Sequence, residues 1–165
     1  MAKRKSQKFY PKTYMLLAGA ISLFAFLTFF LPPLTGAEKP MSFDIVYFSS
    51  ENYYGAVPSL IAYVMILASC VLFFLCAFVI NKDEKTWCLI ATLLLVASGI
   101  ILLFTANFYV NSLHAPEWVN PDLVEQVKAE QLEITKLGIG AITGVALSWV
   151  SALAGLLCIR SLKGK

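Results

Sequence analysis

Ionisable side chains are missing from four long apolar runs that dominate the 165-residue chain. Charged residues make up only 14% of the sequence, and Asp, Glu, Lys, Arg and His are absent from the interior of every run. A proton-coupled exporter needs such a residue within the membrane to couple transport to ion movement. The sequence therefore disfavours an active transporter that acts alone, and it leaves open a channel or an accessory subunit.

Histidine and cysteine are also scarce where metal or redox chemistry would need them. Histidine occurs once, as His114, and the four cysteines all lie inside the apolar runs, at Cys70, Cys76, Cys88 and Cys158. Their positions exclude an outer disulfide framework and the paired outer cysteines of a quinone-linked thiol oxidase. A metal cluster of the last three cysteines is one interpretation, because they lie at similar depth, but small apolar packing is favoured. We expect no metal, no cofactor and no catalytic residue.

The four apolar runs are each long enough to cross a bilayer. They cover about residues 14–31, 58–80, 87–106 and 137–159, and about 20 helical residues span a hydrocarbon core of roughly 30 Å. Pro32 and Pro33 should end the first run, and Pro58 suits the first helical position of the second. We predict an all-α integral membrane fold, a four-transmembrane-helix bundle formed by one domain of residues 1–165.

The basic residues are distributed unevenly between the connecting segments. Ten of the thirteen lie before the first run, between the second and third, or after the fourth: Lys3, Arg4, Lys5, Lys8, Lys12, Lys82, Lys85, Arg160, Lys163 and Lys165. The positive-inside rule then predicts a multi-pass protein of the cytoplasmic (cell) membrane with both termini in the cytoplasm. Topology and anionic lipid account for these cations, so nucleic acid is not an expected partner.

The N-terminus has the basic start and apolar run of a signal peptide. Its apolar core, residues 14–31, is longer than the roughly 7 to 15 residues of a signal core, and no clean small-x-small cleavage site precedes the outer loop. We therefore expect the first run to be retained as a membrane span.

Small residues form a stripe along the fourth run. At about 100° per residue they fall on one face of a helix, which favours close packing of a neighbouring backbone. The stripe consists of Gly140, Gly144, Ser148, Ser151, Gly155 and Cys158. Small residues also recur at heptad spacing in the other runs, at Ala18 and Ala25, at Ala62, Ser69 and Cys76, and at Ala91, Ser98 and Thr105. A period near 3.5 favours left-handed packing at shallow angles.

Trp149 lies near the middle of the fourth run, on the face opposite Gly140. Tryptophan normally prefers the membrane interface, where its N–H group can reach water. Contact with lipid or a loose contact within the bundle is one explanation of this position. The sharper hypothesis is that Trp149 contacts a partner protein or a second copy of the chain.

Both expected outer loops contain a recognisable local pattern. The segment 41–48 in the first loop, residues 35–57, is compatible with a short strand or hairpin or with a position in the membrane interface. In the second loop, Asn120-Pro121-Asp122 has the pattern of a helix N-terminus. An amphipathic helix is therefore expected over about residues 121–136. Because no helix breaker follows it, we predict that it is continuous with the last span and extends beyond the membrane.

The four-span plan resembles claudin-type tetraspans in topology, but the tryptophan and cysteine signature of their first outer loop is absent. The chain is more similar to small four-span membrane proteins of Gram-positive bacteria. That resemblance covers the whole chain and transfers no functional residue. We expect a non-enzymatic scaffold or accessory subunit whose partner is another membrane protein or a second copy. The alternative is an oligomeric small-molecule or ion pathway, and a membrane enzyme is the least favoured class.

Overall fold

The computed structural model describes residues 11–36, 40–41, 46, 53–80, 83–112 and 120–162. Its elements follow in the order α1 (Pro11–Leu27), η1 (Thr28–Phe30), β1 (Leu34–Thr35), β2 (Pro40–Met41), α3 (Tyr53–Phe78), α4 (Glu84–Leu103), α5 (Thr105–Asn111), α6 (Pro121–Ile134), β3 (Lys136–Leu137) and α7 (Ile139–Leu162). The helical class agrees with the sequence prediction. The two strands β1 and β2 overlap the predicted strand segment 41–48 only at Met41.

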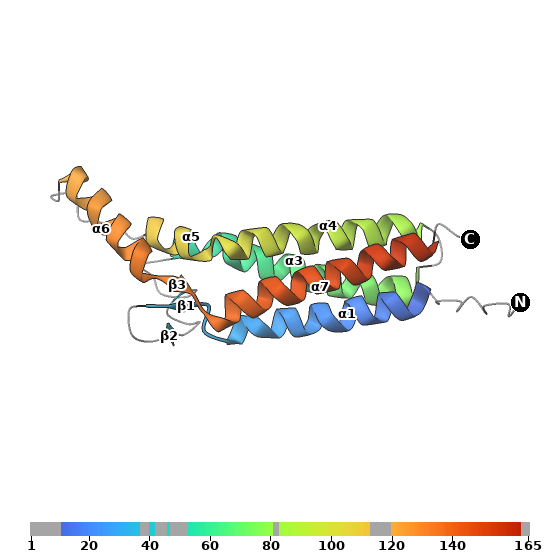
Figure 1. Cartoon of the computed structure of the whole chain (residues 1–165). Helices are drawn as coiled ribbons and strands as arrows, with labels where there is room; N and C mark the ends of the chain where they lie inside the picture. Colours follow the sequence, from blue (N-terminus) through green and yellow to red (C-terminus); the bar gives the residue numbers. More distant parts are fainter. Residues whose placement is uncertain are drawn as a thin grey trace, which may run out of the picture.

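Four helices lie side by side in a bundle (Figure 1). Helix α1 packs against α3 and α7, and α4 packs against the same two helices, so the four form a closed ring of neighbours. Each of the four segments Pro11–Phe30, Val57–Phe78, Glu84–Leu103 and Ile139–Leu162 is long and apolar enough to cross a membrane. One end of the bundle holds the start of α1 and the end of α7, and we call it the terminal end. The other end carries α5, α6 and the three strands, and we call it the cap end.

The first two long helices differ in how well their bounds were predicted. Helix α1 with η1 ends just before Leu31, whose backbone is extended as expected for a residue that precedes proline. The predicted start of the second helix at Pro58 is wrong, because α3 begins at Tyr53 and contains Pro58. Proline near a helix start removes one backbone hydrogen bond but does not prevent the helix from continuing. The strongly apolar part still begins at Val57.

The third span also differs in detail from the prediction. The N-cap residue of α4 is Asp83, which adopts a left-handed backbone with φ 58°, so the helix begins at Glu84 rather than at about residue 87. At the other end, Phe104 leaves helical geometry and separates α4 from α5. The Thr105 hydroxyl donates to the Leu102 carbonyl at 2.8 Å. A hydroxyl that bonds a carbonyl one turn earlier competes with the backbone N–H groups of the helix for that acceptor.

A small antiparallel sheet closes the cap end, with strand order β2-β1-β3. Leu34 pairs with Met41 on one side and with Leu137 on the other. The sheet therefore ties the segment after α1 to the segment before α7. Val46 is also buried, whereas residues 42–45 and 47–48 of the predicted strand segment lie outside the described residues.

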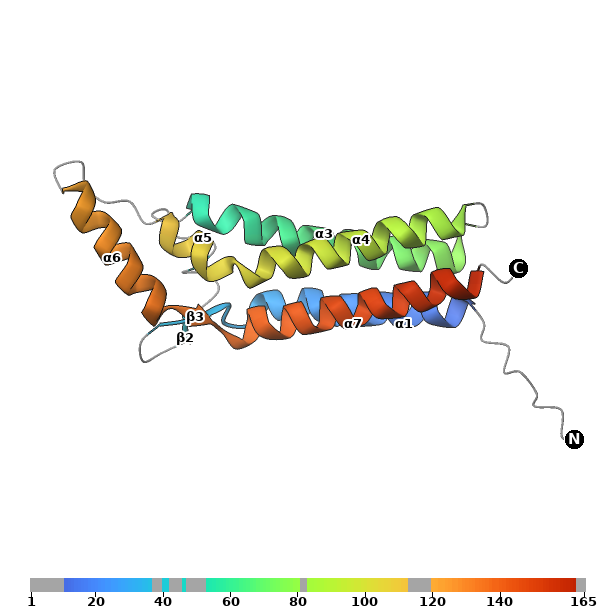
Figure 2. The ribbon, with the colours of Figure 1, turned by 45° about the horizontal axis from the view of Figure 1, so that its top comes forward.

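The predicted continuous helix from residue 121 into the last span is wrong. Helix α6 ends at Ile134, Thr135 is extended, and β3 precedes α7. The Gly138 N–H donates to the Pro33 carbonyl at 2.8 Å, and the Gly140 N–H donates to the Pro32 carbonyl at 2.9 Å. Pairing with the first loop thus replaces the intrahelical hydrogen bonds that a continuous helix would have made. Figure 2 shows the resulting angle between α6 and the bundle.

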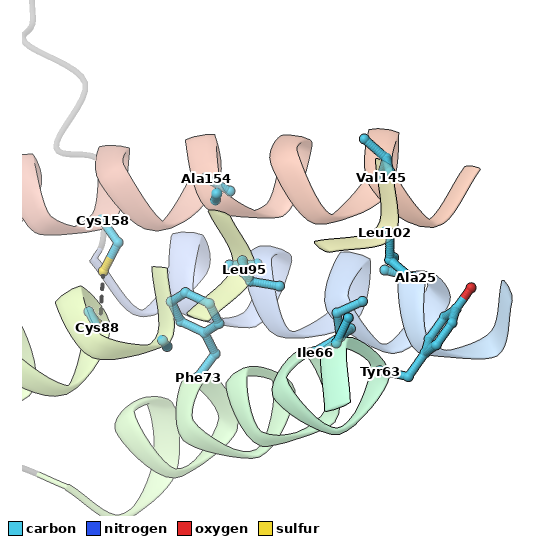
Figure 3. Packing of buried hydrophobic residues seen from close by; sticks show 14 of the residues in the cluster. Ala25, Tyr63, Ile66, Phe73, Cys88, Leu95, Leu102, Val145, Ala154 and Cys158 are labelled. Carbon is cyan, nitrogen blue, oxygen red and sulfur yellow. Dashed lines mark hydrogen bonds between the residues drawn. The ribbon is translucent and has the colours of Figure 1, made fainter. Parts of the chain in front are cut away.

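The bundle interior contains the small residues predicted from heptad spacing. The eight predicted positions in α1, α3, α4 and α5 are all buried: Ala18, Ala25, Ala62, Ser69, Cys76, Ala91, Ser98 and Thr105. Larger side chains fill the space between them, among them Tyr63, Ile66, Phe73, Leu95 and Leu102 (Figure 3).

Candidate functional site

The small-residue stripe of α7 lies inside the bundle. All of its six members are buried: Gly140, Gly144, Ser148, Ser151, Gly155 and Cys158. Since α7 packs against both α1 and α4, this face lies where two neighbours must approach one backbone. In the described structure, other helices of the same chain therefore cover the stripe.

The three glycines of the stripe are in close contact with other elements. A β-carbon on Gly140 would lie 2.6 Å from the Leu31 carbonyl oxygen, and one on Gly144 would lie 2.9 Å from the Thr28 hydroxyl. A β-carbon on Gly155 would overlap the Thr92 hydroxyl and lie 2.9 Å from the ring of Phe73. Real β-carbons avoid such distances, so each glycine permits an approach that a larger residue would prevent.

The two serines of the stripe form hydrogen bonds that satisfy their buried hydroxyls. Ser148 donates to the Gly144 carbonyl of its own helix at 2.7 Å. Ser151 reaches α1, where its hydroxyl donates to the Ala18 carbonyl at 2.7 Å and lies 2.8 Å from the Ser22 hydroxyl. In an apolar medium such interhelical contacts help to fix the pairing of α1 with α7.

The buried face of α7 is wider than the sequence pattern indicated. Ala141, Val145, Ala152 and Ala154 are buried beside the stripe. A wider face follows from the position of α7 between two neighbours, since α1 and α4 together cover more than one side of the helix. The sequence signal was weak because alanine and valine also suit a surface that faces lipid.

Trp149 lies at the edge of this face and contacts α4. A β-carbon on Gly99 would overlap the indole nitrogen and lie 2.6 Å from Cδ1 of Trp149. The indole therefore packs against the backbone of Gly99, where a side chain would prevent the contact, and 41% of Trp149 remains exposed. The contact with Gly99 is a contact within the bundle, which was one of the two explanations of the position of Trp149. Contact of its exposed part with a partner stays a prediction.

Helix α6 offers an apolar surface that the bundle does not cover. None of its residues is buried, and the exposed fractions are 53% for Leu123, 53% for Val127 and 42% for Ile134. At about 100° per residue these three side chains lie within roughly 40° of one another. We call them the α6 stripe. Leu137, which lay within the continuous helix predicted from the sequence, belongs instead to β3 and is half-buried.

Three features define where α6 begins, where it ends and how it lies beside α5. At its start, the Asn120 side chain accepts a hydrogen bond of 3.1 Å from the Asp122 N–H, as the N-cap pattern predicted. At its end, the chain enters β3 and the sheet. Between them, the Lys128 ammonium donates to the Asn111 carbonyl at 3.1 Å, at the last residue of α5. A cation is favourable there because the C-terminal end of a helix carries partial negative charge.

The charges on α6 are mainly negative and exposed. Four carboxylates, Asp122, Glu125, Glu130 and Glu133, stand against the single ammonium of Lys128. At about 100° per residue, Glu130 lies about 20° from Leu123 and so borders the α6 stripe. The helix thus combines an apolar stripe with an acidic surround.

The cysteines are buried in the bundle, and two of them meet. The Sγ atoms of Cys88 on α4 and Cys158 on α7 are 3.8 Å apart (Figure 3). Cys70 instead donates to the Gly19 carbonyl at 3.4 Å. Within the described ranges, no three His, Cys, Asp or Glu side chains are grouped so that they could hold a metal ion. His114 lies outside the described residues.

No protein-family model matches the chain, and no curated protein or solved structure is significantly similar to it. A function must therefore be argued from the geometry itself. The α6 stripe is the candidate functional site, because it is an organised surface that the described part of the chain leaves uncovered.

Proposed function

We propose that this protein is a multi-pass protein of the cytoplasmic membrane whose terminal end faces the cytoplasm and whose cap end faces outward. Four helices of sufficient length and apolarity support membrane insertion. The orientation is supported by the excess of cations in the segments that join at the terminal end. Exposed apolar side chains around the bundle, such as Phe24, Val64 and Leu153, would then face lipid.

The function that this geometry supports best is that of a non-enzymatic scaffold or accessory subunit. The observation that carries the proposal is the exposure of Leu123, Val127 and Ile134 on a helix held clear of the bundle. Three apolar side chains that stay exposed on one face of an amphipathic helix are typical of helix-in-groove recognition. The bundle would hold α6 at a fixed place above the membrane, and α6 would bind the partner.

The charge of α6 indicates what kind of surface would bind it. Two copies of α6 placed side by side would bring eight carboxylates together against two ammonium groups. A partner that offers an apolar groove with basic residues at its rim avoids this repulsion. We therefore favour the outer domain of a different membrane protein over a second copy of this chain.

Site-specific photocrosslinking in native membranes tests the proposal. A photoreactive phenylalanine analogue at Val127 should capture one partner protein in a reproducible ratio. The same analogue at Ala129 is the matched control, because Ala129 is exposed on the same helix about 160° away. Leu123→Ser should reduce capture from residue 127 at least about fivefold, as expected for the loss of roughly 1 kcal/mol of apolar contact.

Two results would contradict the docking role. Equal capture from residues 127 and 129 would show that α6 has no preferred binding face. Capture of lipid alone from residue 127 would show that α6 lies on the bilayer. Since Leu123 is exposed, Leu123→Ser should leave the melting temperature in detergent unchanged, which separates lost binding from lost folding.

A small-molecule or ion pathway formed by several copies is the second candidate. The buried hydroxyls of Ser59 and Thr105, 3.0 Å apart near the cap end, are the polar groups that such a path would use. Purified protein in liposomes decides between the two functions. Solute flux that is reproducibly above that of empty vesicles would favour the pathway.

A further inference from the structure

Cys88 and Cys158 bring two thiols together from helices that are far apart in the sequence. Their Sγ atoms lie 3.8 Å apart, and both residues are 0% exposed. Cys88 is in the second turn of α4 and Cys158 is in the last two turns of α7, so the pair lies near the terminal end. In Figure 3 the two side chains point toward each other across the space between the helices.

The surroundings of the pair favour an uncharged product. Cys76 and Ala91 belong to the same buried core cluster as the pair, and the Cys158 thiol lies 3.8 Å from the Pro11 carbonyl. A zinc ion held by these two thiolates would lack the further protein ligands of a four-coordinate site, because no third His, Cys, Asp or Glu among the described residues is grouped with them. A disulfide carries no charge, and its two sulfurs lie about 2.05 Å apart.

We propose that Cys88 and Cys158 form a reversible disulfide that joins α4 to α7 under oxidising conditions. Hydrogen peroxide, a small uncharged oxidant, can supply the chemistry in two steps. It first oxidises one thiol to a sulfenic acid and releases one water. The sulfur of the second cysteine then attacks the sulfenic sulfur, the S–S bond forms, and the hydroxyl leaves as a second water with the remaining thiol proton. A dithiol reductant reverses the reaction.

The disulfide would link the α3–α4 pair of helices covalently to the α1–α7 pair. Helix α4 belongs to the pair joined by the short turn at Asp83, whereas α7 packs directly on α1. All four cysteines are free in the structure, so no disulfide links these two halves. A covalent link at the terminal end would restrict their separation and stabilise the closed bundle. The proposal is independent of partner binding by α6.

A cleavable variant of the full-length chain gives a direct test. A protease site inserted between Ser112 and Asn120 divides the chain so that Cys88 and Cys158 lie on different fragments. The membranes are treated with hydrogen peroxide, free thiols are blocked, and the chain is then cut and run without reductant. The Cys70→Ala/Cys76→Ala variant should keep its two fragments linked, and dithiothreitol should release them.

The Cys88→Ala variant, which keeps Cys70, Cys76 and Cys158, is the matched control. Its first fragment still holds two cysteines, so selective pairing predicts at least a tenfold loss of the linked product. Linkage that persists in this variant would overturn the proposal, and so would failure of the Cys70→Ala/Cys76→Ala variant to link. As a second measurement, oxidation should raise the melting temperature in detergent by about 5 °C or more, because the bond closes a long loop. An unchanged or lower melting temperature would overturn the proposed stabilisation.

Discussion

Gly144 occupies a place where three other helical segments approach α7. A β-carbon there would meet Thr28 at 2.9 Å, Leu102 at 3.3 Å and the Tyr63 hydroxyl at 3.4 Å. Lipid chains are as apolar as leucine, so helices in a membrane gain stability from close packing rather than from burial alone. The absence of a side chain at residue 144 is therefore a condition for the closed ring of helices.

Gly144→Leu should destabilise the bundle. Its side chain has no space between Thr28 and Leu102, and overpacking of this kind costs about 1–3 kcal/mol or more. Thermal unfolding in detergent measures the effect. Ala146→Leu is the matched control, because Ala146 is exposed on the same helix and should tolerate the change. Equal stability of the two variants would contradict the packing assigned to Gly144.

The sequence predicted small packing residues better than it predicted specific contacts. Spacing alone places Gly140, Gly144 and Gly155 on one face, because the helical period fixes which positions share a side. The contact of Trp149 with Gly99 depends on the angle and depth at which α7 lies beside α4. No local pattern holds that information, since the two residues belong to different helices.

At the scale of single elements, the separation of α6 from α7 is the main departure from the sequence prediction. Local propensity offered no reason to end a helix at Ile134, and Gly138 alone is a weak signal. The break arises from distant residues, because Leu34 pairs with Leu137 and the Pro33 carbonyl accepts from Gly138. Long-range pairing can override local helix preference, whereas the Asn120 cap at the other end is local and was predicted.

Lys128→Met should loosen α6 without unfolding the bundle. The change removes the hydrogen bond to the Asn111 carbonyl, and a cation at an exposed helix C-terminus contributes only about 0.3–1 kcal/mol. Spin labels on Asn107 of α5 and Ala129 of α6 should therefore report a broader distance distribution in pulsed electron resonance. Both labelled positions are exposed.

Glu125→Gln is the control for this measurement. It removes an exposed charge from α6 but keeps the hydrogen bond between Lys128 and the Asn111 carbonyl. Its distance distribution should match that of the parent protein. If Lys128→Met gives the same narrow distribution, the sheet and the remaining contacts with α5 are sufficient to position α6. In that case the contact with Asn111 has no orienting role.

At the scale of the whole molecule, physical limits made the architecture predictable. Bilayer thickness sets the length of a spanning helix, and the sequence contains four apolar runs of that length. The turn at Asp83 is so short that α3 and α4 must be antiparallel neighbours, as observed. The full ring of neighbours and the three-stranded sheet depend on contacts between distant segments, and no sequence pattern specified them.

The proposed orientation gives the last prediction, which rests on the distribution of charge. Ten of the thirteen cations belong to segments assigned to the cytoplasmic side, and eight of the ten acids belong to the two outer loops. With Cys70, Cys76, Cys88 and Cys158 replaced by alanine, single cysteines at Lys3, Lys163, Glu51 and Glu125 can be tested with an impermeant maleimide. Of these four sites, only Glu125 lies among the described residues.

In intact cells, residues 51 and 125 should be labelled, and residues 3 and 163 should be labelled only after the membrane is permeabilised. The physical reason is that translocating basic segments is opposed during insertion, whereas carboxylates hardly influence orientation. The permeabilised sample is the control, because it shows that each cysteine can react. Labelling of residue 3 in intact cells would reverse the orientation, place α6 in the cytoplasm, and direct the search for its partner to cytoplasmic proteins.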